Sequence, residues 1–410
     1  MIGFNVRGAT TAFVSVAISI ALISLGAADD KKYDAGASDT TIRVGNIMPY
    51  SGPASAYGAI GRAITAYFKM VNDRGGINGR KVDFVSYDDA YSPPKTVEQA
   101  RKLVESDEVL LIAGSFGTAG NSAIQRYLNQ KHVPQLYVVS GASRFNDPEH
   151  FPWTMGLGAT YRIETSIYAA YLLKEKPSAK IAVLYQNDDA GKELLKGLRE
   201  GLGDKLGQIV AESAYEVTEP TIDSHVVNLK ASGADVLFSL ATPKFAAQSI
   251  KKAAEIDWHP LHFLPVVSSS IGATLAPAGL QNSKGVISAA FLKDATDPQW
   301  NEDPGMNRYR DFLSKYMPDA NRSDALLAAG YTTAQAVELV LRRCGNNLTR
   351  DNVMKQAANF ERVSFDLLLP GIKVNTSPGD FTAIKDMNLM RFDGNSWQLF
   401  GGLVRAQASE

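Results

Sequence analysis

Short apolar runs alternate with longer segments of helical periodicity along most of this chain. In its first half, the predicted strands and helices follow one another at residues 42–48, 59–73, 81–87, 95–106, 109–113, 118–131 and 135–139. A second series of the same architecture occupies residues 162–174, 180–185, 190–202, 208–214, 221–232, 236–240, 244–255 and 261–266. Strands that alternate with helices of this length predict parallel sheets that are covered on both faces and connected by right-handed crossovers.

The last third of the chain predicts a return to the first sheet. Residues 151–160, rich in glycine and aromatic side chains, are suited to a crossover between the two series. Beyond the second series we expect a strand at 285–291, followed by helices whose apolar spacing suits covering the first sheet, at 300–317, 323–344 and 350–359. Residues 387–404 predict two strands with a turn at 393–395.

The amino-terminal residues 1–28 have the layout of a secretory signal peptide. Arg7 is the single charge, an apolar run covers residues 12–25, and small residues end at Ala28, after which we expect cleavage. The alternative is an uncleaved membrane anchor, but a run of about 14 residues is short for a bilayer that needs about 20. Residues 29–40 are small and polar and predict a disordered leader.

Length and charge narrow the class of protein. About 380 of the 410 residues remain after cleavage, which exceeds one core and predicts two domains. Removing residues 1–28 leaves 41 basic and 43 acidic residues, so nothing favours a nucleic acid or an anionic membrane as partner. Cys344 has no second cysteine to pair with, and we expect it to be a buried small apolar residue at the end of a helix.

The segment 41–89 gives the strongest indication of function. An apolar run is stopped by Pro49, and the loop 50–58 then offers small polar groups and one ring, Tyr57, before a helix begins. In open α/β sheets, ligands bind beyond the carboxyl ends of the strands, where loops supply N–H groups and hydroxyls. The loop carries no obvious catalytic group, which favours binding over catalysis.

This segment, TIRVGNIMPYSGPASAYGAIGRAITAYFKMVNDRGGINGRKVDFVSYDD, resembles the first lobe of the periplasmic solute-binding proteins of the branched-chain amino acid type, which serve ABC importers. The resemblance extends over nearly all of the chain after residue 40. It implies the type I periplasmic-binding fold: two doubly wound parallel-sheet lobes, joined by three hinge crossovers near 158–162, 288–292 and 384–388, that close on a ligand like a Venus flytrap. The expected division is lobe I at 41–160, lobe II at 161–290, a return to lobe I at 291–385 and a lobe II tail at 386–410.

Two loops in lobe I are candidates for holding a carboxylate. Gly117 and Thr118 stand at a predicted helix start, where free N–H groups and a hydroxyl suit an anion, although simple N-capping by Thr118 is the alternative. The next strand ends in Ser140, Gly141 and Ala142, which on their own predict only a turn. The resemblance implies that both loops form one carboxylate site and that Tyr57 covers the apolar part of the ligand, whereas on the residues alone Tyr57 could be a surface aromatic.

Lobe II departs from the pattern of the amino-acid binders. Relatives that hold leucine or valine place an acid after the strand at 261–265 to pair with the ligand's ammonium group, and Val266 stands there in this sequence. A buried ammonium without a partner costs several kcal/mol, so an ordinary α-amino acid is disfavoured. Two ring positions of relatives fall on Ala190 and Thr242, which predicts a roomier site. Asp188 and Asp189 lie in the same loop as Ala190 and could contact a ligand.

One further feature of the resemblance concerns lobe I. Some relatives bridge two cysteines at the positions of Tyr91 and Gly117, and both are absent here. The joint loss supports the register of the resemblance and implies that the lobe does without the bridge.

Other polar motifs do not predict catalysis or a metal site. The pairs Asp88-Asp89 and Asp188-Asp189 each follow a strand and precede a turn, where aspartate favours capping. His259 and His262 have no helix to align them and no further ligand at suitable spacing. We expect no cofactor, no metal and no catalysed reaction.

The sequence therefore predicts a monomeric periplasmic protein that captures a small carboxylate, with a non-amino aromatic acid ahead of an aliphatic one, and delivers it to an ABC permease in the inner membrane. The alternatives are a binder of branched-chain or other amino acids, whose ammonium group Asp188 or Asp189 would pair with, a binder of amides or urea, and an enzyme of the cleft.

Overall fold

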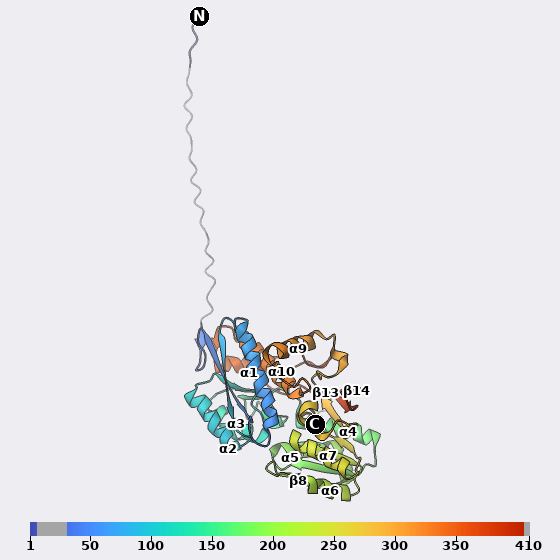
Figure 1. Ribbon diagram of the computed structural model, residues 1–410. Helices are drawn as coiled ribbons and strands as arrows, with labels where there is room; N and C mark the ends of the chain where they lie inside the picture. The colour runs from blue at the N-terminus through green and yellow to red at the C-terminus, as the bar shows by residue number, and fades with distance from the viewer. Residues whose placement is uncertain (6–30, 406–410) are drawn as a thin grey trace.

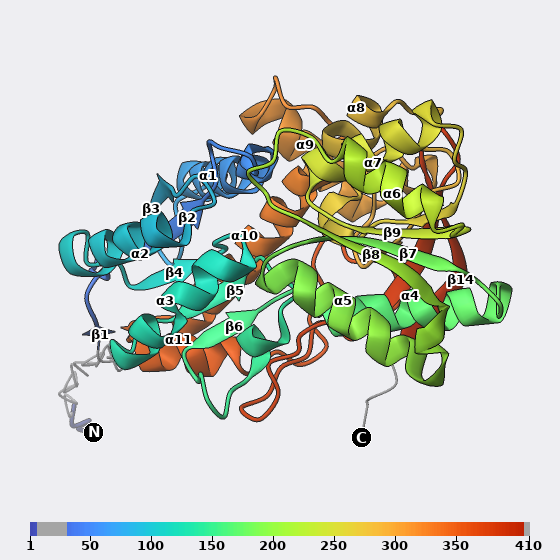
Figure 2. The same cartoon turned by 90° about the horizontal axis from the view of Figure 1, so that it is seen from below.

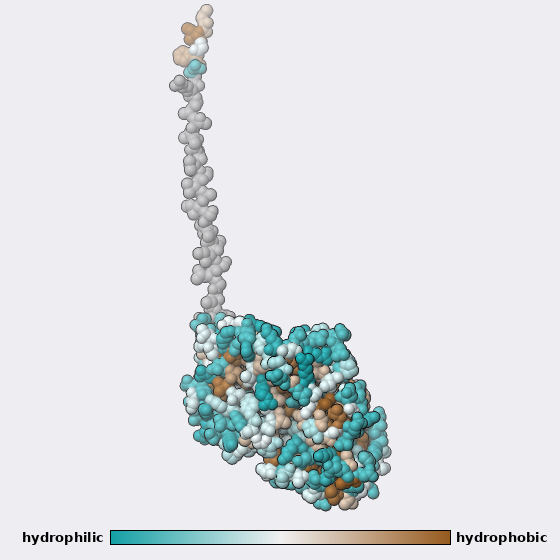
Figure 3. All heavy atoms as spheres, viewed as in Figure 1, coloured by the Kyte–Doolittle hydropathy of each residue, from teal (hydrophilic) through white to brown (hydrophobic). Residues whose placement is uncertain are grey.

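The computed structural model describes residues 1–5 and 31–405, which form two lobes, each built around its own sheet (Figures 1 and 2). Most of the predicted signal peptide, including the cleavage site at Ala28, lies outside the described residues. Within the described chain, no helix is both long and apolar enough to cross a membrane. The visible face is largely hydrophilic with separate hydrophobic spots (Figure 3).

The first sheet has five strands in the order β3-β2-β4-β5-β6. All neighbours pair in parallel. The strands are β2 (Thr41–Met48), β3 (Lys81–Asp88), β4 (Leu111–Ala113), β5 (Gln135–Val138) and β6 (Thr154–Gly156). The fifth strand lies inside the segment 151–160, which the sequence predicted only as a crossover.

Helices from two distant parts of the chain cover this sheet. The early ones are α1 (Gly58–Asp73), α2 (Pro93–Arg101) and α3 (Thr118–Gln130), and the late ones are α9 (Pro304–Tyr316), α10 (Ala325–Cys344) and α11 (Arg350–Ala357). Helix α1 packs along α10 (Figure 1). The apolar face predicted for α1 is buried, as is Cys344 at the end of α10. The late helix α10 therefore lies against α1 and β5 of the first lobe.

The second sheet has seven strands in the order β14-β13-β11-β10-β9-β7-β8. Strand β13 pairs antiparallel with both β11 and β14, and the other neighbours are parallel. The strands are β7 (Ile181–Gln186), β8 (Ile209–Tyr215), β9 (Val236–Leu240), β10 (Leu261–Phe263), β11 (Ile287–Ala290), β13 (Asp386–Phe392) and β14 (Trp397–Arg405). The helices of this lobe are α4 (Tyr161–Glu175), α5 (Asp189–Leu202), α6 (Asp223–Ala231), α7 (Pro243–Glu255) and α8 (Ala276–Ala278).

Two elements differ from their predicted bounds for local reasons. Strand β10 ends at Phe263, because Pro265 has no N–H to continue the ladder and a short 3-10 turn, Val266–Ser268, follows. Helix α9 begins at Pro304 rather than at residue 300, because the Asp303 side chain accepts a hydrogen bond from the Met306 N–H and caps the helix there.

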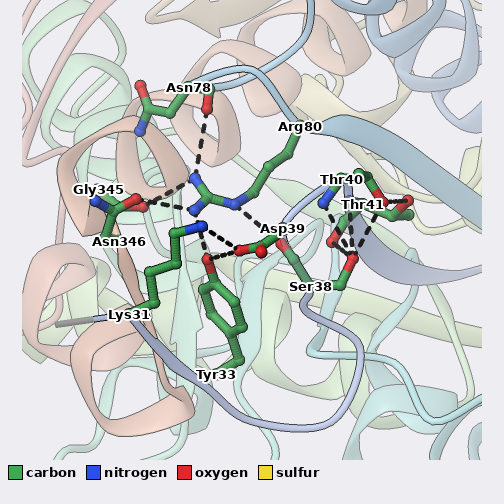
Figure 4. A network of polar contacts seen from close by, with 10 residues as sticks. All are labelled: Lys31, Tyr33, Ser38, Asp39, Thr40, Thr41, Asn78, Arg80, Gly345 and Asn346. Carbon is green, nitrogen blue, oxygen red and sulfur yellow. Dashed lines mark hydrogen bonds and ion pairs between the residues drawn. The ribbon is translucent and has the colours of Figure 1, made fainter. Parts of the chain in front are cut away.

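The predicted disordered leader is wrong over residues 31–40. Strand β1 (Lys32–Tyr33) pairs in parallel with β12 (Asn347–Leu348), which follows α10. The guanidinium of Arg80 donates to the Tyr33 hydroxyl at 2.7 Å and to the carbonyl oxygen of Ser38 at 3.0 Å (Figure 4). These long-range bonds order a segment whose composition alone predicts disorder.

Candidate functional site

The strand order places two sets of loops opposite each other. In the first sheet the order reverses between β2 and β4, and in the second between β7 and β9. A crevice at the carboxyl ends of the strands forms at such a switch point. Tyr57 follows β2 and Thr118 follows β4, while Ala190 follows β7 and Thr242 follows β9, so the predicted residues of both lobes stand at these two points.

The hydroxyls of Thr118 and Ser140 meet. Oγ1 of Thr118 and Oγ of Ser140 are 2.8 Å apart, and both side chains are buried. The two loops are held together because Val139 N–H donates to Ser115 and Gly117 N–H donates to Val139. Thr118 does not cap its helix: Gly117 occupies the N-cap position, so the capping alternative is wrong.

The side chain of Tyr161 lies next to this pair of hydroxyls. Burial raises the pKa of Tyr161 to about 12, and hydrogen bonding to Thr118 and Ser140 lowers it in part. Its N–H donates to the carbonyl oxygen of Gly141 at 2.7 Å, and a Cβ at Gly141 would be 2.5 Å from the Tyr161 ring. Glycine at 141 therefore permits this close approach. The N–H of Ala142 donates to Oγ of Ser140 at 3.1 Å.

Aromatic rings form one wall of the site. The ring of Tyr57 stacks on Phe116 with centroids 3.8 Å apart, and it is 1% exposed, so it is not a surface aromatic. Gly117 lies against the ring of Tyr91.

Two cavities adjoin these residues. The larger has a volume of about 150 Å³, and its lining includes four of the predicted residues, Tyr57, Ser140, Gly141 and Val266. The smaller has a volume of about 20 Å³ and is lined by Tyr57 and four further predicted residues, Gly117, Thr118, Ala190 and Thr242. Because Thr118 and Ser140 touch each other, the hydroxyl pair lies at the junction of the two cavities.

Of the two acids predicted in lobe II, Asp188 has structural partners. Asp188 caps α5 by accepting from the N–H groups of Ala190 and Gly191, both at 3.0 Å, and its other oxygen accepts from the Tyr91 hydroxyl at 3.4 Å. Asp189 is exposed at the start of α5. Ala142, Asp188 and Asp189 line neither cavity.

An acid does lie beside Val266, contrary to the sequence-based expectation. The Val266 N–H donates to Oε1 of Glu164 at 2.6 Å, and the Tyr168 hydroxyl donates to the same oxygen at 2.8 Å. Glu164 comes from the first turn of α4 and is 3% exposed. Burial raises the pKa of its carboxyl to about 7, although the two hydrogen bonds lower it. The inference that lobe II offers no acid at this point is wrong.

Sequence reasoning also missed the contribution of the hinge segments. The larger cavity is lined by residues of all three predicted crossovers, among them Gly158, Ala159, Ala290, Phe291 and Met387. The first turns of α10 add Leu326, Ala329 and Thr333. The sequence signal that could have indicated this contribution was the presence of apolar residues at the expected crossover positions.

The aspartate and histidine motifs for which the sequence predicted neither catalysis nor a metal site make hydrogen bonds within the protein or are exposed. Asp88 accepts from the N–H groups of Tyr50, Ser51 and Ala90, as expected of an aspartate at a turn. The His262 ring is buried, and its Nε2 lies 2.8 Å from Oγ of Ser239, whereas the side chain of His259 is exposed. Within residues 1–5 and 31–405, no cluster of three or more histidine, cysteine or acidic side chains is arranged to hold a metal.

The two lobes touch across the entrance of the site. The Ser143 N–H, from the loop after β5, donates to Oε1 of Glu193 on α5 at 2.7 Å. Helices α3 and α5 also contact each other, and they lie side by side in Figure 2. These contacts and the Tyr91–Asp188 bond join the two lobes.

Comparison with known proteins gives consistent results. A family model described as periplasmic binding protein matches residues 41–396. The chain is 24% identical over 326 residues to Leu/Ile/Val-binding protein homolog 7 of Brucella abortus (strain 2308), which covers 75% of this chain and 77% of the relative. The fold is similar to that of a branched-chain amino acid ABC transporter protein from Thermus thermophilus with bound valine, at a TM-score of 0.82 and 16% identity over 90% of this chain and 98% of that one. It is also similar to a solute-binding protein from Rhodopseudomonas palustris BisB5 in complex with 3,4-dihydroxy benzoic acid, at a TM-score of 0.74 and 20% identity over 89% of this chain and 98% of that one.

Proposed function

Because the chain belongs to the periplasmic binding proteins of the branched-chain amino acid type, which bind solutes for ABC transporters and are not enzymes, we propose that its ligand is a small organic carboxylate without an amino group, with an aromatic acid as the first candidate. The carboxylate is received by the hydroxyls of Thr118 and Ser140, and the body of the ligand occupies the larger cavity.

One observation carries this proposal: Ser140, whose buried hydroxyl is paired with that of Thr118, lines an apolar cavity of about 150 Å³. An engineered cavity of about that volume in another protein takes up benzene. Rings and aliphatic side chains dominate the lining, including Tyr57, Phe116, Leu157 and Val267. A ring of six carbons with a carboxylate matches such a site, because its polar end pairs with the hydroxyls and its body removes apolar surface from water.

A specific observation favours a second candidate, an α-amino acid. Glu164 lies beside Val266, where an ionised carboxylate can pair with an ammonium group. The aromatic acid remains the first candidate because burial opposes the ionised form of Glu164, as its raised pKa indicates.

Calorimetric titration with 4-hydroxybenzoate, benzoate and leucine separates the two candidates. We expect the aromatic acids to bind and leucine to bind weakly or not at all. A thermal-shift screen of carboxylates and amino acids extends the test, since a ligand at a hundred times its dissociation constant stabilises the folded protein by about 2.7 kcal/mol. Tight leucine binding without binding of any aromatic acid contradicts the proposal.

The proposed mechanism is closure. A ligand that contacts both lobes shifts the hinge equilibrium toward the closed form, which a membrane permease then recognises. We further propose that the protein is a monomer exported by the signal peptide at residues 1–28. Mass spectrometry of the protein recovered from the periplasm tests the export and the cleavage, because cleavage after Ala28 leaves Asp29 as the first residue.

A further inference from the structure

The two oxygens of Glu164 have different surroundings. Oε1 accepts a hydrogen bond from the Val266 N–H at 2.6 Å and lies 2.8 Å from the Tyr168 hydroxyl, whose single proton it shares with the Leu264 carbonyl oxygen at 3.0 Å. Oε2 has no hydrogen-bond partner within the described chain, and it is not among the polar atoms sealed from solvent. Because Glu164 lines the larger cavity and its Oε1 is already engaged, Oε2 is the oxygen left to meet a ligand there.

This asymmetry matches a neutral carboxylic acid. The carbonyl oxygen of a protonated carboxyl accepts hydrogen bonds, and its other oxygen carries one proton to donate. An ionised carboxylate buried with one oxygen unpartnered would bear an uncompensated charge, which costs several kcal/mol.

The charged and titratable groups around Glu164 do not favour its ionised form. On α4, Tyr161 and Tyr168 are phenols whose pKa values burial raises. Across the cavity, the Nζ of Lys293 pairs with Oδ2 of Asp303 at 2.7 Å, and Asp294, which bonds Thr296, has a raised pKa because it is buried. From the remaining side, the turn at Val266–Ser268 contributes an N–H and no charge. Among the described residues, no basic side chain contacts Glu164.

We propose that Glu164 serves the ligand site as a neutral carboxylic acid, with Oε1 as its carbonyl oxygen and Oε2–H donating to an acceptor oxygen on the body of the ligand. Glu164 then selects an anionic acid bearing a second oxygen, such as a hydroxybenzoate, and rejects an ammonium group. This inference rests on the proposed function. It adds that the second oxygen of the ligand is recognised and that binding is coupled to a proton.

Calorimetry of the full-length protein with benzoate and 4-hydroxybenzoate tests the inference without any variant. At pH 8 we expect each molecule of 4-hydroxybenzoate to bind with uptake of close to one proton, measured from the dependence of the heat on the buffer's ionisation enthalpy. At pH 6 we expect almost none, because Glu164 is already protonated there. The affinity is expected to fall by about fivefold between pH 7 and pH 8.

The variant Glu164→Gln gives the second arm. Its amide retains an oxygen for Val266 and Tyr168 and places an NH₂ donor where Oε2 stood, so it imitates the neutral acid. We expect its affinity for 4-hydroxybenzoate to lie within about threefold of the wild-type value at pH 6, with no proton uptake and no pH dependence. Glu175→Gln, an exposed change at the end of the same helix, is the control and is expected to behave as wild type.

The outcomes separate the inference from the proposed function. If the wild-type protein binds neither aromatic acid, both fail. If it binds them without proton uptake at pH 8, or with an affinity that rises with pH, the inference is overturned and the proposed function stands. If Glu164→Gln abolishes a tight binding of leucine, Glu164 is an ionised partner of an ammonium group and the inference is overturned.

Discussion

The ring of Tyr91 lies against the backbone of Gly117, close enough that a Cβ at position 117 would be 2.9 Å from Cε2 of the ring. Gly117 also has a φ of +98°, in a region that residues with a side chain rarely adopt. Since Gly117 is the N-cap of α3 and precedes Thr118, the ring and the glycine together determine where the hydroxyl of Thr118 lies.

Replacing Gly117 by alanine is expected to destabilise the protein by about 2–4 kcal/mol, because the substitution combines backbone strain with a steric clash. Gly79→Ala is a matched control: its φ is +82°, and nothing lies within 4 Å of the added Cβ. Urea denaturation of both variants separates the two costs. Equal losses of stability in the two variants would show that the Tyr91 ring moves aside and that backbone strain alone destabilises Gly117→Ala.

Thr118→Val tests the hydroxyl pair. The substitution keeps the size of the side chain and removes the group that bonds Ser140, so we expect a carboxylate ligand to lose about 1–3 kcal/mol of binding free energy. Thr118→Ser retains the hydroxyl, and its binding free energy is expected to stay within a few tenths of a kcal/mol of the wild-type value. Calorimetry with the ligand identified in the screen measures both. An unchanged affinity in Thr118→Val would favour a ligand without a carboxylate, such as an amide.

The sequence predicted most of the fold because its elements are local. A few consecutive residues are enough to predict strand β2 and helix α1. The loop between them is predicted by Pro49 and the glycines around it. The candidate residues Tyr57, Thr118 and Val266 were predictable for a related reason, since ligand contacts in open α/β sheets follow strand ends.

What the sequence could not predict depends on contacts between distant segments. Nothing near Val266 indicates an acid, because Glu164 reaches it from α4, more than a hundred residues earlier. In its own neighbourhood, Glu164 resembles an ordinary acid in the first turn of a helix. The prediction for residues 31–40 was wrong for the same reason, because the residue that orders this segment, Arg80, lies in the turn between α1 and β3.

Arg80→Ala is expected to destabilise the protein by about 2–4 kcal/mol. The guanidinium is buried and donates to Tyr33, Ser38 and Asn346, so its removal leaves several acceptors unpaired and frees the amino-terminal segment. Arg126→Ala on α3 is the control, since Arg126 is exposed. Hydrogen exchange of residues 31–40 reports the local effect. Unchanged protection there would show that the pairing of β1 with β12 suffices.

The contact between Ser143 and Glu193 is expected to stabilise the closed form. Because the two residues belong to different lobes, Glu193→Ala removes a bond that the open form cannot make and should weaken ligand binding by about 1 kcal/mol without lowering the stability of either lobe. Oγ of Ser143 donates to the same Oε1 of Glu193 at 2.5 Å, and a double-mutant cycle with Ser143→Ala isolates this side-chain bond, while small-angle scattering reports the closure. Additive effects of the two substitutions would show that the two side chains do not interact in solution.

The pH dependence of stability gives a test of Glu164 that needs no ligand. Burial raises the pKa of its carboxyl in the folded protein to about 7, against an ordinary value of 4.5, so between these values the folded state holds more protons than the unfolded state. Stability from this group is therefore complete below pH 4.5 and is lost as pH rises, by about 3 kcal/mol at pH 8. Glu164→Gln cannot titrate. The free energy of unfolding of the wild-type protein should therefore fall relative to that of the variant as the pH rises from 5 to 8. A constant difference, or one of opposite sign, would mean that the carboxyl is ionised in the folded protein at neutral pH.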